Sequence, residues 1–228
     1  MCMAPSPFAR LLAACSPVCA ELLPNSLDAV REWRSVFVGM GRESEPNPVL
    51  SAWRAGALAG HLEKSLRDVV GSGFVHLGRT LDMIELGFGP DVLLADSTIS
   101  NRWLPAHVFH VQCPFRLDDA DRTLVGSRDV YADAQDGGSL HNYSDFGPQA
   151  DRPNLFDAEA KRFFDVHPSG SLRCTGVTAD NSGGIALSLD GGYVMRVFPN
   201  ASHIDEFWRY FRPDTTGDDL VVFNNDVD

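Results

Sequence analysis

Two histidines and one cysteine recur at intervals of three residues, as His107, His110 and Cys113. On a helix these positions would share one side, where they could bind a zinc ion. However, Pro105 and Pro114 bracket the segment, and the β-branched and aromatic residues inside it favour a strand. In a strand His107 and Cys113 would lie about 20 Å apart, and His110 would point to the opposite side. We therefore expect no metal site, no bound cofactor and no cysteine–histidine nucleophile from this segment alone.

The polar residues of the same segment are better candidates for a binding surface. From 109 to 117 the odd positions are apolar, whereas His110, Gln112 and Arg116 occupy even positions. This alternation is typical of a strand with one face in the core, so the three polar side chains should share the other face. Such a face could bind an anion or a partner's side chains, whereas the alternative is a solvated face whose charges pair internally. The candidate binding residues, with contributions from neighbouring strands, are His110, Gln112, Arg116, Arg128 and Asp129.

Motifs of several common enzyme classes are absent from the chain. It contains no G-x-x-x-x-G-K-[ST] phosphate loop, no G-x-S-x-G, no H-E-x-x-H and no paired C-x-x-C. An isolated cysteine among apolar residues is usually structural, so Cys113 is expected to be buried and unreactive. We therefore predict no catalytic residue.

Short β-type segments separated by glycine and aspartate clusters must position these side chains. Hairpin turns are expected at Leu117–Thr123 and at Asp190–Gly192. Pro114 should place the central strand at an edge or at a bulge. Because consecutive strands are linked by hairpins, we expect an α+β fold with a largely antiparallel sheet and helices packed on one face. The expected strands are 79–88, 91–95, 103–117, 123–131, 172–179, 184–190, 193–198 and 219–223.

The chain is expected to have two parts. Residues 1–70 should form an N-terminal helical extension, with helices from Asn25 or Ser26 to Val38 and from Pro48 to Val70. The first 25 residues or so are rich in proline, and poor order is expected there. Residues 71–228 should form the α+β sheet domain, with a helix that is capped by Asn154 or Asp157 and ends at His167–Pro168. The segment 207–211 fits either a helical turn or a strand.

Composition limits the classes of partner. The 228-residue chain has a formal net charge of -12, without a stripe of lysine and arginine that could neutralise nucleic-acid phosphates. No apolar run approaches the ~18 residues of a membrane span. Five irregularly spaced cysteines indicate reduced thiols and a cytoplasmic protein. A cationic partner is therefore easier to accommodate than an anionic one, although solubility alone also explains an acidic surface.

Several segments together resemble a group of small uncharacterised bacterial cytoplasmic proteins, which carry an LH-[IV]-QC-P-W-R strand followed by a GS-x-D-[IVL]-Y strand. The likeness covers about residues 74–224. In this chain Phe109 stands where the group usually has leucine, and Phe115 replaces tryptophan. The resemblance implies a cytoplasmic location and supplies no catalytic residue. The segments that carry it are Leu81–Met83, Gly87–Gly89, His110–Arg116, Val125–Tyr131 and Glu206–Phe211.

Two functions fit these observations. The first is a non-enzymatic cytoplasmic interaction protein, either an immunity-type neutraliser or an accessory binder of a cationic partner. The second is an enzyme or small-ligand-binding protein that uses the His/Gln/Arg surface of the central strand. The sequence leaves the oligomeric state open.

Overall fold

The computed structural model of the protein describes residues 57–94, 103–135, 154–202, 205–217 and 219–223. The helix expected between residues 25 and 38 and the first turns of the helix expected from Pro48 lie outside these ranges. The expectation of poor order in the first 25 residues lies outside them as well.

One antiparallel sheet has the strand order β1-β2-β3-β9-β10. The segment 207–211, which the sequence left undecided, is the strand β9. Between β1 and β2 the chain reverses at Leu81, which has a φ of 60°. The strand predicted at 79–88 is therefore wrong at its start, because this turn uses a leucine in the left-handed region instead of a glycine or asparagine. The strands are β1 (Phe74–Thr80), β2 (Met83–Leu93), β3 (Trp103–Val111), β9 (Glu206–Phe211) and β10 (Leu220–Phe223).

A second antiparallel sheet has the strand order β5-β4-β8-β7-β6. The hairpin predicted at Asp190–Gly192 is confirmed between β7 and β8, where Gly191 and Gly192 have φ angles of 76° and 83°. The hairpin predicted after Leu117 is confirmed between β4 and β5. The strands are β4 (Phe115–Asp118), β5 (Thr123–Gly126), β6 (Cys174–Ala179), β7 (Ile185–Leu189) and β8 (Val194–Val197).

The central segment passes from one sheet to the other. The extended conformation predicted around Phe109 is confirmed, but the single strand predicted for 103–117 is divided into β3 and β4. Between them lies Pro114, which has no N–H to donate to a ladder. Its carbonyl accepts a hydrogen bond from the N–H of Phe198 at 2.8 Å. The strand predicted at 123–131 is also shorter than expected, because a 3-10 helix, η3 (Ser127–Tyr131), follows β5.

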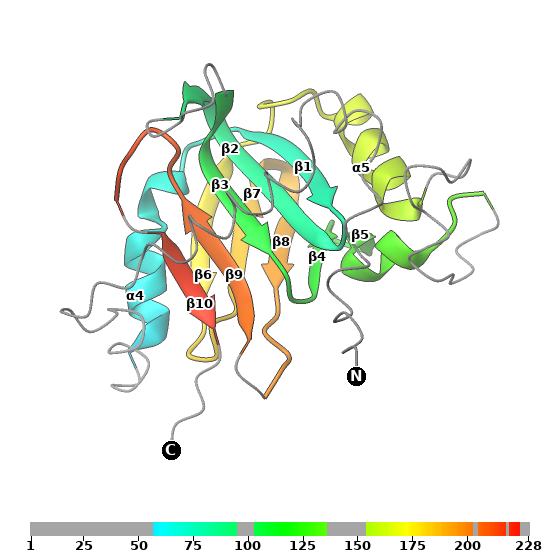
Figure 1. The fold of residues 1–228 in the computed structure, drawn as a ribbon. Helices are drawn as coiled ribbons and strands as arrows, with labels where there is room; N and C mark the ends of the chain where they lie inside the picture. The colour runs from blue at the N-terminus through cyan, green and yellow to red at the C-terminus, as the bar shows by residue number, and fades with distance from the viewer. Residues whose placement is uncertain (1–56, 95–102, 136–153, 203–204, 218, 224–228) are drawn as a thin grey trace, which may run out of the picture.

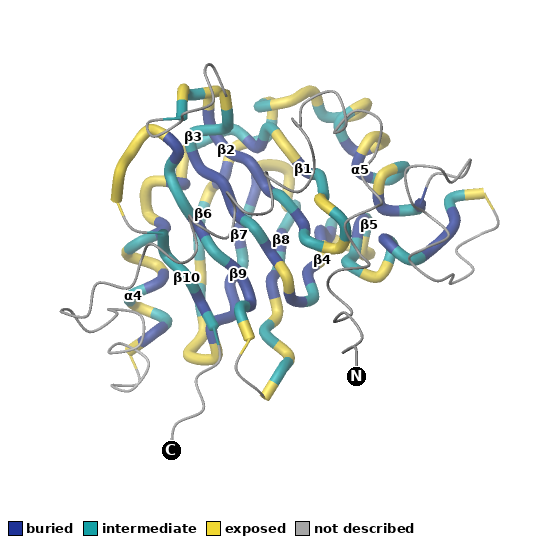
Figure 2. The backbone as a smooth tube through the Cα atoms, in the orientation of Figure 1, coloured by how far each residue is buried: buried dark blue, intermediate teal, exposed yellow. Residues whose placement is uncertain are grey.

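The two sheets lie face to face, with the first in front of the second in the view of Figure 1. Their facing side chains form one hydrophobic cluster, which includes Phe109 and Trp208 of the first sheet and Leu117, Leu187 and Met195 of the second. These five side chains have no measurable exposure. Figure 2 shows the buried residues concentrated along the central strands and the exposed ones in the connections.

A helix flanks the sandwich on each side (Figure 1). Helix α4 (Leu58–Ser65) lies beside β6 and buries Leu58 and Leu62, four residues apart and therefore on one face. Helix α5 (Leu155–Val166) lies beside β1 and β5. Of the two caps that the sequence left open, Asn154 is the one observed, and its side chain accepts a hydrogen bond from the N–H of Asp157 at 2.7 Å.

The prediction of an α+β fold with largely antiparallel pairing is confirmed. The structure adds that the strands are divided between two packed sheets, with the helices at the sides of the sandwich. The last helix of the predicted N-terminal extension contributes to the same hydrophobic cluster as both sheets. In the described residues no helix has both the length and the apolar character needed to cross a membrane.

Candidate functional site

His110 lies on the outer face of the first sheet, between two charged residues. It is directly opposite Glu85 of β2 and Arg209 of β9, and its ring meets the ring of Phe211 edge-on at 5.1 Å. Burial disfavours the charged form of Glu85, but hydrogen bonds from His76 and Thr80 and the nearby charge of His110 outweigh it and lower its pKa. The carboxylate of Glu85 is therefore already stabilised by its neighbours.

Arg209 is held by two carboxylates, those of Glu206 and Asp219. Its Nε and Nη2 groups donate to both oxygens of Glu206 at 2.7 and 2.5 Å, and its Nη1 group lies 3.5 Å from Asp219. Although burial opposes the charge, these hydrogen bonds and charges raise the pKa of Arg209. The row around His110 therefore pairs its charges internally.

The structure does not bring His110, Gln112 and Arg116 together on one sheet. Gln112 is exposed at the bend after β3, where its N–H donates to the carbonyl of Phe207 at 2.9 Å. Arg116 follows Pro114 and belongs to β4 of the second sheet, directly opposite Arg196 of β8. The period-two pattern continues through the bend, but the sheet that carries it changes.

Arg116 and Arg196 share one carboxylate, that of Asp118. Its Oδ2 atom accepts hydrogen bonds from Nε of Arg116 at 2.8 Å and from Nη1 of Arg196 at 2.6 Å. Its Oδ1 atom accepts a hydrogen bond from the hydroxyl of Thr123 at 2.8 Å. The guanidinium of Arg116 also lies over the ring of Phe198, 5.1 Å from its centre.

Arg128 and Asp129 lie in the 3-10 helix η3, and their surroundings differ. Arg128 is exposed, whereas Asp129 is half-buried and accepts a hydrogen bond from the N–H of Gly126 at 2.8 Å. Burial raises the pKa of the Asp129 carboxyl, and the single hydrogen bond from Gly126 only partly offsets it. Among the described residues no lysine, arginine or histidine forms an ion pair with this carboxylate.

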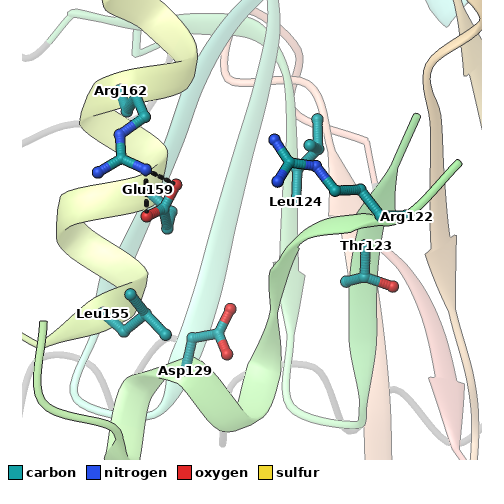
Figure 3. A pocket seen from close by; sticks show the side chains of 7 residues that line it. All are labelled: Arg122, Thr123, Leu124, Asp129, Leu155, Glu159 and Arg162. Carbon is teal, nitrogen blue, oxygen red and sulfur yellow. Dashed lines mark hydrogen bonds and ion pairs between the residues drawn. The ribbon is translucent and has the colours of Figure 1, made fainter. Parts of the chain in front are cut away.

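The Asp129 side chain points into a pocket of about 360 Å³ between β5, η3 and α5 (Figure 3). At one end of this view lie Asp129 and Leu155; at the other lie two arginines that have their own acidic neighbours. Arg162 lies 2.9 Å from Glu159, and Arg122 lies 3.8 Å from Asp119. The pocket is lined by Arg122, Thr123, Leu124, Asp129, Leu155, Glu159 and Arg162.

Both arginines of the pocket lie at its solvent-exposed rim, since the side chains of Arg122 and Arg162 are 76% and 71% exposed. Water therefore screens their charges, whereas the Asp129 carboxylate lies deeper. Leu155 supplies an apolar wall near this carboxylate, and Leu124 supplies one toward Arg122 (Figure 3). This arrangement can accept a group with an aliphatic stem and a cationic head.

Among the described residues, the thiols of Cys113 and Cys174 and the inward-facing His107 do not form a nucleophilic site. Cys113 is 7% exposed, and burial raises the pKa of its thiol to about 12. Nδ1 of His107 is hydrogen-bonded to the hydroxyl of Tyr210 at 2.8 Å, and burial, together with the charge of Arg212, lowers the pKa of the imidazole. In the ranges that the structure describes, no group of histidine, cysteine and carboxylate side chains could hold a metal ion.

Sequence reasoning selected Asp129 but missed the pocket around it. Arg122 comes from the β4–β5 hairpin, whereas Glu159 and Arg162 come from α5, more than thirty residues later. Contacts between residues this far apart in the chain produce no local sequence pattern. The available signal was the spacing of Glu159 and Arg162, which places them on one face of the helix.

Comparison with protein-family models, with curated proteins and with solved structures found no match for this chain.

Proposed function

We propose that this protein binds a basic partner protein, and that the Asp129 pocket receives a lysine or arginine side chain of that partner. The observation that carries the proposal is the Asp129 carboxylate, which is half-buried and faces the pocket, and with which no cationic side chain of the described residues forms an ion pair. A partly desolvated carboxylate gains more from an incoming cation than a fully hydrated one does.

The walls of the pocket suit the rest of such a side chain. The head of lysine or arginine would reach Asp129 beside Leu155, while its methylene stem extends toward Leu124 at the other end of the pocket (Figure 3). The formal net charge of -12 would attract a basic partner over longer distances and accelerate the encounter.

The partner we propose is encountered in the cytoplasm, where this protein would act as a neutraliser or an accessory binder. The buried cysteines Cys113 and Cys174 are both free, which suits a reducing compartment. The raised pKa of the Cys113 thiol and the separation of His110 from Arg116 between two sheets favour binding over nucleophilic catalysis.

The proposal can be tested with single-residue probes. N-acetyl-arginine amide and N-acetyl-lysine amide each present one cationic side chain, and N-acetyl-norleucine amide presents an uncharged stem. We expect the two cationic probes to shift the amide resonances of Gly126 and Leu155 in a saturable way, whereas the neutral probe does not. The amide resonance of Gly126 responds directly to binding at Asp129, because the N–H of Gly126 donates a hydrogen bond to the Asp129 carboxylate.

The variant Asp129→Asn should weaken the binding of the cationic probes by about tenfold, the usual effect of removing one charged hydrogen-bond partner. Asp165→Asn is the matched control, because it changes the net charge equally and lies on α5 outside the pocket, paired with Lys161. Equal weakening by both variants would show general electrostatic attraction and contradict a site at Asp129.

A further inference from the structure

The outer face of the second sheet carries two arginines that one carboxylate holds side by side. Nε of Arg116 and Nη1 of Arg196 donate to the same oxygen of Asp118, so the two guanidinium groups are immediate neighbours. Their strands pair at this position, with Arg116 directly opposite Arg196. The pairing of the strands therefore fixes the backbone positions of the two arginines, and the carboxylate of Asp118 fixes their guanidinium groups.

Most donors of the two arginines remain available. In the described part of the chain, Nη1 and Nη2 of Arg116 and Nε and Nη2 of Arg196 have no hydrogen-bond acceptor. The side chains are 47% and 36% exposed, so these donors are accessible, whereas the Asp118 side chain beneath them is 12% exposed. A guanidinium that is already held in position loses less conformational entropy when it binds an acceptor.

The local charge is not balanced. Among the described residues, these two guanidinium groups form ion pairs with one carboxylate, that of Asp118, which leaves an excess of one positive charge within this cluster of three side chains. On the far side of Arg196, the same row of the sheet continues with Ala186 and Thr178, neither of which is acidic. Beside Arg116 the ring of Phe198 is 39% exposed and supplies an apolar surface. A singly charged anion would balance this excess.

We propose that Arg116 and Arg196 form a binding site for the carboxylate of a small organic acid, with the acid's apolar part against Phe198. Arginine matches a carboxylate with two parallel N–H donors, and the excess of one positive charge matches a single negative charge. This site uses the second sheet and is separate from the Asp129 pocket, whose lining includes neither arginine.

Binding can be measured from the arginine side chains themselves. In a sample labelled with ¹⁵N, the Nε–Hε resonances of Arg116 and Arg196 are followed during titration with sodium benzoate, sodium acetate and inorganic phosphate at constant ionic strength. We expect benzoate to shift both resonances in a saturable way. Acetate should bind at the same place with an affinity at least about threefold lower, because it lacks the ring that contacts Phe198.

The double variant Arg116→Lys/Arg196→Lys keeps the net charge but loses the planar donors, and it should weaken benzoate binding by about tenfold. The matched control is Arg67→Lys, since Arg67 is an exposed arginine in the 3-10 helix Arg67–Val69, outside both proposed sites, and should leave benzoate binding unchanged.

Three outcomes would overturn the proposal. The first is a linear, non-saturating shift in which the resonance of Arg67 moves as much as those of Arg116 and Arg196 do. The second is saturable binding of phosphate without binding of either carboxylate. The third is full benzoate affinity in the double lysine variant. The resonances of the unmodified protein decide the first two outcomes even where the double variant does not fold.

Discussion

Asp129→Asn separates a binding role for Asp129 from a structural one, because the two roles predict opposite changes in stability. The carboxylate accepts one hydrogen bond, from the N–H of Gly126, and asparagine can accept the same bond through its side-chain oxygen. The variant therefore keeps the contact and removes only the charge. In the folded protein that charge is disfavoured by burial, which raises the pKa of Asp129.

The magnitude follows from these two contributions. The retained hydrogen bond contributes no difference, whereas Asp129→Ala would lose it, at a cost of about 1 kcal/mol. Removing a partly exposed, uncompensated charge changes the free energy of unfolding by at most about 1 kcal/mol, here in the stabilising direction. Because the folded-state pKa is raised, the ionised carboxylate destabilises the fold above that pKa. The gain from asparagine should therefore be present at neutral pH and shrink as the pH falls toward the ordinary aspartate pKa of about 4.

Urea denaturation of the parent protein, Asp129→Asn and Asp129→Ala at several pH values measures this difference. We expect the asparagine variant to be as stable as the parent or slightly more stable at pH 7, and the alanine variant to be less stable. If the asparagine variant were destabilised as strongly as the alanine variant at every pH, the charge of Asp129 would stabilise the fold. That result would contradict a binding role for this carboxylate.

Three further predictions concern the core and the buried polar groups. Leu62→Ala in α4 should reduce the free energy of unfolding by about 3 kcal/mol, since Leu62 has no exposure, whereas the exposed Lys64→Ala should change it little; urea denaturation compares them. The pKa of His107 is lowered in the folded protein, so the unfolded chain binds a proton at this residue more readily. The free energy of unfolding should therefore fall as the pH drops below about 6.5, and it should fall less in the variant His107→Gln. The Cys113 thiol should react with a thiol reagent only after denaturation, as mass spectrometry of the labelled protein would show; rapid labelling of the native protein would contradict its burial.

Local patterns predicted the elements whose signals lie within a few neighbouring residues. The apolar alternation around Phe109 gave an extended strand, the Asp190–Gly192 sequence gave a hairpin, and Asn154 gave the start of α5. In each case the residue that determines the backbone is part of the element itself.

The features that were missed depend on contacts between distant residues. A pattern of period two cannot show that a strand changes sheets at Pro114, because the side chains alternate in the same way before and after the bend. The turn at Leu81 uses a residue that carries no turn signal. For the site, the sequence selected Asp129 and Arg116, but Glu159, which lines the same pocket as Asp129, and Arg196, which shares the carboxylate of Asp118 with Arg116, follow from tertiary structure.

The most direct test of the proposed function is the pKa of the Asp129 carboxyl, followed by ¹³C NMR through a pH titration with and without N-acetyl-arginine amide. In the unbound protein we expect a pKa above the ordinary aspartate value, as burial requires. With the probe at saturation the pKa should fall, because a guanidinium in the pocket stabilises the charged form. A pKa that stays the same at saturating probe would contradict the claim that this carboxylate receives a partner's cation.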